Sequence, residues 1–389
     1  MPDCLVVLGN TLSALALTRV AARAGWRVIL ASDTEGIAGK SRLAEKLIFQ
    51  KSDPEYILAK LERTVGKSTA FCIADSDRWL RFIAAHRNRL ETIFSDLLHP
   101  DQKVLNICLD KNRFLAWCRQ NSITAPVDYT VDASGKITPD PIFPLLLRPE
   151  LTQHETSKGL PKAVEIRDMA DLQAWLKKFK ALDVTPALSQ SLLFPDVKQY
   201  AAGFVRRKDG QTLITVAEKL RSFPEQCAGG TYMVARPDAG VENFTRRILD
   251  SLDFYGMGEA EIMFDIHTRT PYIIEINARP WVQYSLAEKM RPGMFDFLTD
   301  NVPPSTNMDK KVNETVRWLH FNADLFVCFS RSTGAVRNGR CSLMSYIGSV
   351  ARANTFALFD FKDPGPFFHN TRELITMMWH TLFKRKTHA

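Results

Sequence analysis

Two glutamates and an asparagine stand in a pattern that could bind a divalent cation. Residues 258–265 read GEAEIMFD and residues 271–280 read PYIIEINARP, and both stretches alternate as half-buried strands do. The short segment between them suits a hairpin loop centred on Thr268. Pairing the strands around that centre predicts two faces. The apolar face pairs Ala260 with Ile276, Ile262 with Ile274 and Phe264 with Tyr272, and the polar face pairs Glu259 with Asn277 and Glu261 with Glu275.

The facing carboxylates carry the chemistry. Cross-strand partners stand about 5 Å apart, and like charges directly opposite each other destabilise a sheet unless a cation lies between them. Glu261, Glu275 and Asn277 offer hard oxygen ligands suited to Mg²⁺, which completes its shell with water and phosphate oxygens. Arg279 follows on the same face and would put a fixed cation near those phosphates. The alternative is a solvated acidic face without a ligand, which the neighbouring Asn277 and Arg279 disfavour.

The elements that precede this hairpin predict a small parallel α/β unit. Glycines two and five residues after Gly9 would complete a dinucleotide-binding fingerprint, but Thr11 and Ala14 stand there. This mismatch favours a Rossmann-like scaffold without NAD over an NAD-dependent enzyme. The expected strands are 4–8, 26–31 and 71–74, and the expected helices are 12–24 and 78–90.

Composition limits the partners. The chain has 389 residues, 45% hydrophobic and 24% charged, which predicts two or three ordinary globular domains. Its net charge of +8 suits anionic ligands, and because the basic residues are spread along the chain we expect no nucleic-acid partner. The seven cysteines include no C-x-x-C pair, which argues against a disulfide framework or a zinc finger. With neither a signal peptide nor a long apolar span, we expect a cytoplasmic location.

The hairpin resembles the metal-binding hairpin of the ATP-grasp superfamily, the carboxylate–amine and carboxylate–thiol ligases. More loosely, Asp110-Lys111 before a helix and the strand 143–149 resemble other parts of these enzymes. Asp363-Pro364-Gly365-Pro366 is similar to a late signature of a branch of predicted ATP-dependent carboligases. The resemblance implies a mixed fold class, α/β and α+β. It would comprise a Rossmann-like pre-ATP-grasp domain at 1–105, an ATP-grasp domain at 106–300 and a C-terminal extension at 301–389.

The resemblance also implies roles for individual residues. Glu261, Glu275 and Asn277 match the metal ligands, for two Mg²⁺ ions that Mn²⁺ could replace. Arg148 stands where a lysine is usual, and the loop 152–161 has a single glycine, so Lys158 and Lys162 could supply positive charge or simply be solvated. The implied nucleotide contacts are Lys111, Arg148 and Lys158 at the phosphates, Leu193 at the adenine and Asp196 at the ribose. The implied catalytic groups are Arg279 and Arg221, the latter steadying an acyl phosphate or else merely a surface arginine.

These residues predict an ATP- and Mg²⁺-dependent ligase acting on a small-molecule carboxylate and an amine. The carboxylate would be activated as an acyl phosphate, with release of ADP and phosphate. A phosphotransferase on the same fold, a carboxylate–thiol ligase and a non-catalytic nucleotide-binding module are the alternatives.

At the C-terminus we expect a helix from Asn370, with a wide apolar face followed by the basic run 384–386. Packing on the extension is favoured for this helix over contact with a membrane surface.

Overall fold

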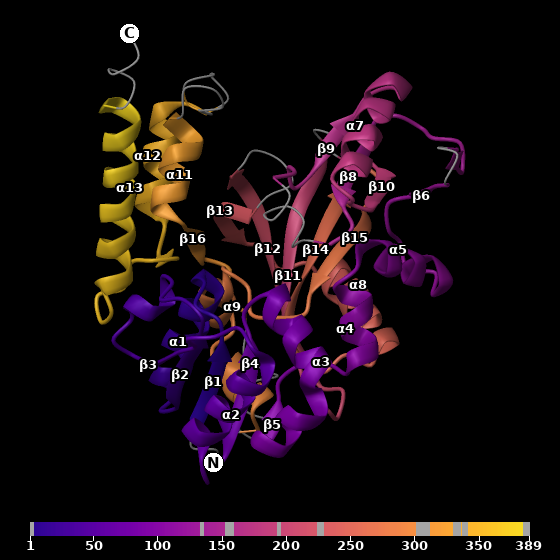
Figure 1. Cartoon of the computed structure of the whole chain (residues 1–389). Helices are drawn as coiled ribbons and strands as arrows, with labels where there is room; N and C mark the ends of the chain where they lie inside the picture. Colours follow the sequence, from indigo (N-terminus) through magenta and orange to yellow (C-terminus); the bar gives the residue numbers. More distant parts are fainter. Residues whose placement is uncertain are drawn as a thin grey trace.

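The computed structural model shows three sheets joined by helices (Figure 1). This arrangement confirms the expected combination of a parallel α/β unit with mixed α+β architecture. The structure describes residues 4–132, 136–151, 159–192, 196–223, 229–300, 312–329, 336 and 341–383, the last seven of them by backbone alone.

The N-terminal sheet is parallel, with strand order β3-β2-β1-β4-β5. Its central strand, CLVVL, is buried along its whole length, as expected for a parallel strand covered by helices on both faces. The strand order reverses beside β1, which is where open α/β sheets bind ligands. The elements are β1 (Cys4–Leu8), α1 (Leu12–Arg23), β2 (Arg27–Ser32), the 3-10 helix η1 (Ala38–Lys40), β3 (Glu45–Ile48), α2 (Pro54–Val65), β4 (Ala70–Ala74), α3 (Asp77–Ile93) and β5 (Asp96–Leu97).

A smaller subdomain follows, built on a sheet of order β7-β6-β10-β8-β9. It has an apolar core of its own, in which Leu147 of the sheet packs with Phe179 of its helix. The elements are α4 (Gln102–Cys108), α5 (Lys111–Gln120), β6 (Asp128–Val131), β7 (Ile137–Thr138), β8 (Leu145–Pro149), β9 (Val164–Ile166), α7 (Met169–Ala181) and β10 (Pro186–Gln190).

The third sheet has seven strands, in the order β15-β14-β11-β12-β13-β16-β17. Trp281 packs so closely over the β11 backbone that a Cβ on Gly203 would lie 2.2 Å from its ring. This sheet carries the predicted hairpin. Its elements up to residue 298 are β11 (Val197–Arg206), β12 (Thr212–Phe223), β13 (Gly229–Ala235), α8 (Ala239–Leu252), β14 (Gly256–Asp265), β15 (Thr270–Asn277), α9 (Tyr284–Met290) and α10 (Met294–Leu298).

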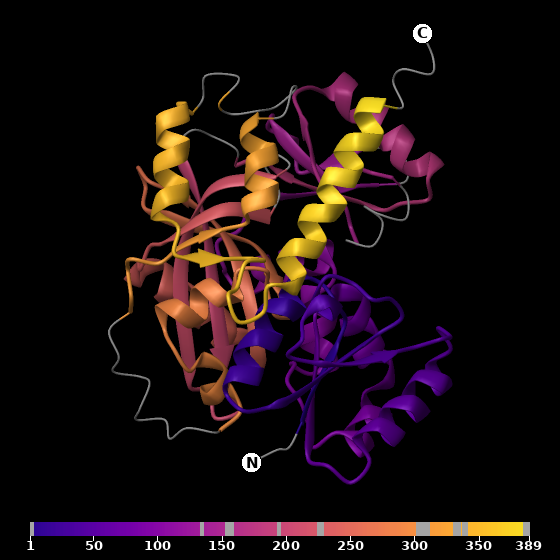
Figure 2. The same cartoon turned by 90° about the vertical axis from the view of Figure 1, so that its left-hand side faces the viewer.

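The C-terminal extension adds two strands to this sheet, two helices that rise from it, and a third helix that begins beside η1 of the N-terminal domain (Figure 2). A buried ion pair between Arg19 of α1 and Asp363, at 2.9 Å, ties the extension to the N-terminal domain. The predicted helix start at Asn370 is wrong, because α13 begins at Gly365 and takes Pro366 into its first turn, where proline is tolerated. The elements are β16 (Arg317–Leu319), α11 (Phe321–Phe329), α12 (Leu343–Arg352), β17 (Thr355–Phe356) and α13 (Gly365–Phe383). Among the described residues, no helix is long and apolar enough to cross a membrane.

Candidate active site

The β14–β15 hairpin brings the two glutamates face to face. Glu261 pairs with Glu275 across the strands, and Glu259 pairs with Asn277, as the alternation predicts. Beyond Glu261 the register shifts by one residue, so the predicted apolar pairs past that point are wrong. A bulge inserts one unpaired residue, here Ile274, and such an insertion cannot be seen by counting alternation. The observed pairs there are Ile262 with Ile273, Met263 with Tyr272 and Phe264 with Pro271.

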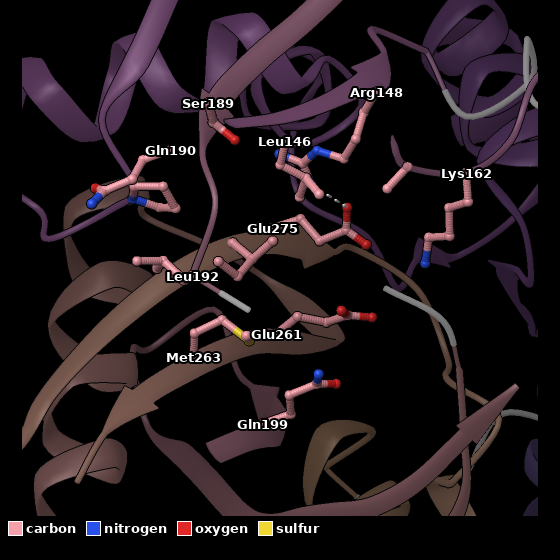
Figure 3. Close-up of a pocket in the computed structure, with 13 residues that line it drawn as sticks. Leu146, Arg148, Lys162, Ser189, Gln190, Leu192, Gln199, Glu261, Met263 and Glu275 are labelled. Atoms are coloured by element: carbon pink, nitrogen blue, oxygen red, sulfur yellow. Dashed lines mark ion pairs between the residues drawn. The ribbon is translucent and has the colours of Figure 1, made fainter. Parts of the chain in front are cut away.

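Buried cations surround these carboxylates. Arg148 Nη1 of β8 lies 3.9 Å from Glu275 Oε2, and Lys219 Nζ of β12 lies 3.7 Å from Glu261 Oε2. In Figure 3, Arg148 and Lys162 flank the carboxylate of Glu275. Burial by itself would raise the pKa of Glu275. The nearby positive charges, listed here in order of effect, instead hold that pKa below its ordinary value: Lys162, Lys111, Arg148 and Arg279.

Glu259 lies deeper than its two neighbours. Its side chain is buried, and burial raises its pKa, with further repulsion from the charge of Glu261. Lys219 and Arg279 act in the opposite direction and favour the ionised form. The strand therefore carries two acidic groups of different character, because Glu261 is partly exposed and Glu259 is buried.

Arg279 joins the hairpin to the N-terminal domain. Its Nε donates to Asp77 Oδ1 at 2.9 Å, and its Nη2 donates to Asn277 Oδ1 at 3.1 Å. Asp77 is the first residue of α3, so the guanidinium is fixed between two domains. The charge of Asp77 also raises the pKa of Arg279, against the effect of burial. This arrangement holds a permanent cation beside the paired carboxylates.

His99 supports the same junction and was missed by sequence reasoning. Its Nε2 accepts a hydrogen bond from the Ala74 amide at 2.7 Å, so the ring is neutral and Nδ1 carries the proton. Nδ1 lies 3.1 Å from the carbonyl oxygen of Ala278, to which it donates. Burial lowers the pKa of His99 to about 3. The ring thereby fixes the backbone between Asn277 and Arg279 to the end of β4.

A cavity opens beside Glu275, between the subdomain sheet and the hairpin (Figure 3). Ile274, the residue displaced by the bulge, lines it. Within the described residues, Arg148 Nε is buried without a hydrogen-bond partner, so this wall offers an unused donor. An apolar slot with charges at one end suits a planar base with an attached anionic group. The lining residues are Pro126, Leu146, Arg148, Lys162, Ala163, Ser189, Gln190, Leu192, Gln199, Glu261, Met263, Ile274 and Glu275.

Solved structures share this fold over most of the chain. The L-amino acid ligase from Bacillus licheniformis is 15% identical, with a TM-score of 0.62 over 81% of this chain and 78% of that one. The ADP complex of an N5-carboxyaminoimidazole ribonucleotide synthetase is 13% identical, with a TM-score of 0.64 over 82% and 81%. A biotin carboxylase from Campylobacter jejuni, complexed with β-γ-ATP, is 12% identical, with a TM-score of 0.61 over 82% and 74%. The chain has the ATP-grasp fold. No family model matches the sequence, and no curated protein matches it.

Within this ATP-grasp fold, several further residues predicted from the sequence meet at the carboxylates. Lys111 begins α5 after the Asp110 N-cap, and its buried side chain faces the Glu275 side of the hairpin. Lys162 lines both the cavity beside Glu275 and a second cavity that reaches Glu259 and Gly230. Lys219 lines the second cavity, although sequence reasoning gave it no role of its own. Its charge, two residues before Arg221 on β12, was the available signal.

Other predicted residues lie apart from this cluster. Asp196 is exposed beside the hairpin turn, where its carboxylate lies 3.3 Å from His267 Nε2. Arg221 points to the C-terminal extension, and its Nε and Nη2 donate to Asp324 at 2.8 and 2.7 Å. The ribose role of Asp196 and the acyl-phosphate role of Arg221 stay predictions. Lys158 and Leu193 lie outside the described residues.

Proposed function

We propose that this protein is an ATP- and Mg²⁺-dependent ligase that activates a carboxylate as an acyl phosphate and joins it to an amine. The observation that carries the proposal is the pairing of Glu261 with Glu275 among buried cations. The similar structures support it as precedents: one bears the name of an L-amino acid ligase, and others are complexes with ADP or an ATP analogue.

The donor set fits magnesium. Glu261, Glu275 and Asn277 would hold the ion, and a second ion at the same carboxylates is part of the proposal. Among the described residues, no group of three or more His, Cys, Asp and Glu could hold a metal by itself. A partial set of this kind suits Mg²⁺, which keeps water and substrate phosphate oxygens in its shell. Bound there, the ion would neutralise charge on the phosphates and orient them.

The charge of the site favours a polyphosphate. Five cations, Lys111, Arg148, Lys162, Lys219 and Arg279, line the three cavities that meet at Glu275, against the four acids Glu259, Glu261, Glu275 and Asp77. Five positive charges less four negative charges leave a net charge of +1 before any metal binds. Focused in a partly buried cleft, that excess attracts anionic substrate. The buried Arg148 would donate hydrogen bonds to phosphate oxygens, and a planar guanidinium suits that contact.

In the proposed reaction, the residues of the site act by positioning the reacting groups. An oxygen of the substrate carboxylate attacks the γ-phosphorus of ATP while the bond to the β–γ bridging oxygen breaks, and ADP leaves. The amine nitrogen then attacks the acyl carbon, phosphate departs and the nitrogen loses a proton. Arg279, fixed by Asp77, would hold the transferring phosphoryl group, and Lys219 would stabilise charge on the opposite side. No side-chain nucleophile is needed, because orientation and electrostatics supply the catalysis.

The test is release of ADP from Mg-ATP with a panel of carboxylates and amines. Hydroxylamine added to the assay converts an acyl phosphate to a hydroxamate, which separates a ligase from a phosphotransferase. We expect Glu275→Gln to abolish turnover while circular dichroism stays unchanged. Glu55→Gln, an exposed position on α2, is the matched control and should retain full activity. Carboxylate-dependent turnover that survives in the Glu275 variant would overturn the proposal.

A further inference from the structure

One buried carboxylate of the hairpin has no role in the proposed metal site. Glu259 lies on β14 two residues before Glu261, on the same face of the sheet. The proposed magnesium ligands are Glu261, Glu275 and Asn277, so Glu259 is left over. It is only 7% exposed, and it lines the second cavity, which has a volume of about 200 Å³. Because a buried charge is costly unless it is paired, a group in this cavity should pair with it.

The nearest cations bind other groups. Lys219 Nζ lies 3.7 Å from Glu261 Oε2. The guanidinium of Arg279 is hydrogen-bonded to the hairpin and to the first residue of α3. Both cations attract the Glu259 carboxylate, but no residue that the structure describes forms a hydrogen bond or an ion pair with it. Glu259 therefore offers a ligand in the cavity a charged hydrogen-bond acceptor.

The strand pairing places Glu259 between an aromatic ring and the metal ligands. Glu259 pairs with Gly203 of β11 on one side and with Asn277 of β15 on the other. The ring of Trp281 occupies the space where a side chain on Gly203 would lie, and it lines the same cavity. Directly opposed residues of antiparallel strands share one face and stand about 5 Å apart, so the indole and the carboxylate are neighbours. A carboxylate beside an indole ring suits an ammonium group.

We propose that Glu259 and Trp281 form the subsite for the nucleophile and select a primary aliphatic amine, which arrives as its ammonium ion. This inference rests on the ligase function proposed above. Trp281 and Val282 would contact the carbon chain of the amine. Two residues along a strand span about 7 Å, so an acyl phosphate fits between a metal at Glu261 and a nitrogen at Glu259. A thiolate would be repelled by the carboxylate, so the subsite favours an amine over a thiol.

The test is a competition between two nucleophiles for the same acyl phosphate. Propylamine, a cation at neutral pH, and hydroxylamine, largely uncharged there, are supplied together with Mg-ATP and a carboxylate that supports ADP release. Glu259→Gln should lower the ratio of amide to hydroxamate about tenfold or more, because the charged hydrogen-bond acceptor is lost. Glu259→Asp keeps the charge and should recover part of the ratio. Glu218→Gln is the matched control: Glu218 is buried in the same sheet but paired with Lys198 and Arg236, and its variant should give the wild-type ratio.

Binding of the amine is measured separately, without turnover. Saturation-transfer difference NMR should show propylammonium bound to the wild type in Mg-ADP, with a dissociation constant about tenfold higher in Glu259→Gln. Equal affinities, or an unchanged ratio of amide to hydroxamate, would overturn the subsite. A loss of Mn²⁺ affinity in Glu259→Gln with an unchanged ratio would make Glu259 a metal ligand instead. Wild-type protein that binds propylammonium through Glu259 but releases no ADP with any carboxylate would refute the ligase function and support the cation site.

Discussion

Replacing Arg221 with methionine should destabilise the protein strongly. Asp324 is fully buried, and its carboxylate accepts hydrogen bonds from Arg221 Nε at 2.8 Å, from Arg221 Nη2 at 2.7 Å and from Thr231 Oγ1 at 2.8 Å. Arg221→Met removes two of these three donors and the compensating charge. Leaving one member of a buried ion pair without its partner costs about 3–5 kcal/mol. We therefore expect the free energy of unfolding to fall by about 3–5 kcal/mol.

A double-mutant cycle isolates the contribution of this pair. Urea unfolding followed by circular dichroism would compare the wild type, Arg221→Met, Asp324→Asn and the double variant. Because the asparagine variant no longer buries a charge, the double variant should be more stable than the summed effects predict, by about 1–3 kcal/mol. A change below about 1 kcal/mol in Arg221→Met would refute the reasoning. Lost turnover with unchanged stability would instead support the acyl-phosphate role predicted for Arg221 from the sequence.

Three further predictions concern the site and its supports. Arg148→Met should weaken Mg-ADP binding about tenfold or more by calorimetry, because a charge-assisted hydrogen bond contributes about 1.5–3 kcal/mol; unchanged affinity would remove Arg148 from the nucleotide site. His99 has a pKa of about 3 in the folded protein, against the ordinary value of 6.5 that applies to the unfolded chain. Between these two pH values the unfolded chain therefore binds one proton that the folded protein does not. The free energy of unfolding consequently rises with pH, by up to about 1.4 kcal/mol per pH unit. This slope should be absent from urea midpoints of His99→Gln, and a parallel slope in both proteins would contradict the assignment. Gly203→Ala should lower stability by about 1–3 kcal/mol, because the new methyl group would lie 2.2 Å from the Trp281 ring; Gly229→Ala, with open space around it, is the control for the same unfolding measurement.

Local patterns made the hairpin predictable. Alternation over residues 258–265 and 271–280 identified both strands, and their spacing paired Glu261 with Glu275 correctly. Counting the alternation could not reveal the bulge after Glu261. In the sequence, a residue that the partner strand leaves unpaired looks the same as a paired one. The bulge also shapes the candidate site, since the displaced Ile274 lines the cavity.

Long-range partners were not predictable in the same way. Asp324 lies 103 residues after Arg221, and its burial depends on how the extension packs against β12. His99 bonds to Ala278 across 179 residues, and its sequence context carries no motif that indicates a role. The cations come from α5, β8, β12 and the residues just before β9 and just after β15, so Lys219 was visible as a charge near Arg221 but not as the neighbour of Glu261. Such contacts depend on tertiary packing.

Anomalous diffraction from crystals grown with Mn²⁺ and a non-hydrolysable ATP analogue tests the central claim most directly. Manganese accepts the same oxygen ligands as magnesium and can be located by its anomalous signal. We predict a peak between the carboxylates of Glu261 and Glu275, with a phosphate oxygen completing the shell. A nucleotide bound in the cavity with no peak at that pair, or with the peak at a different acidic group, would contradict the account.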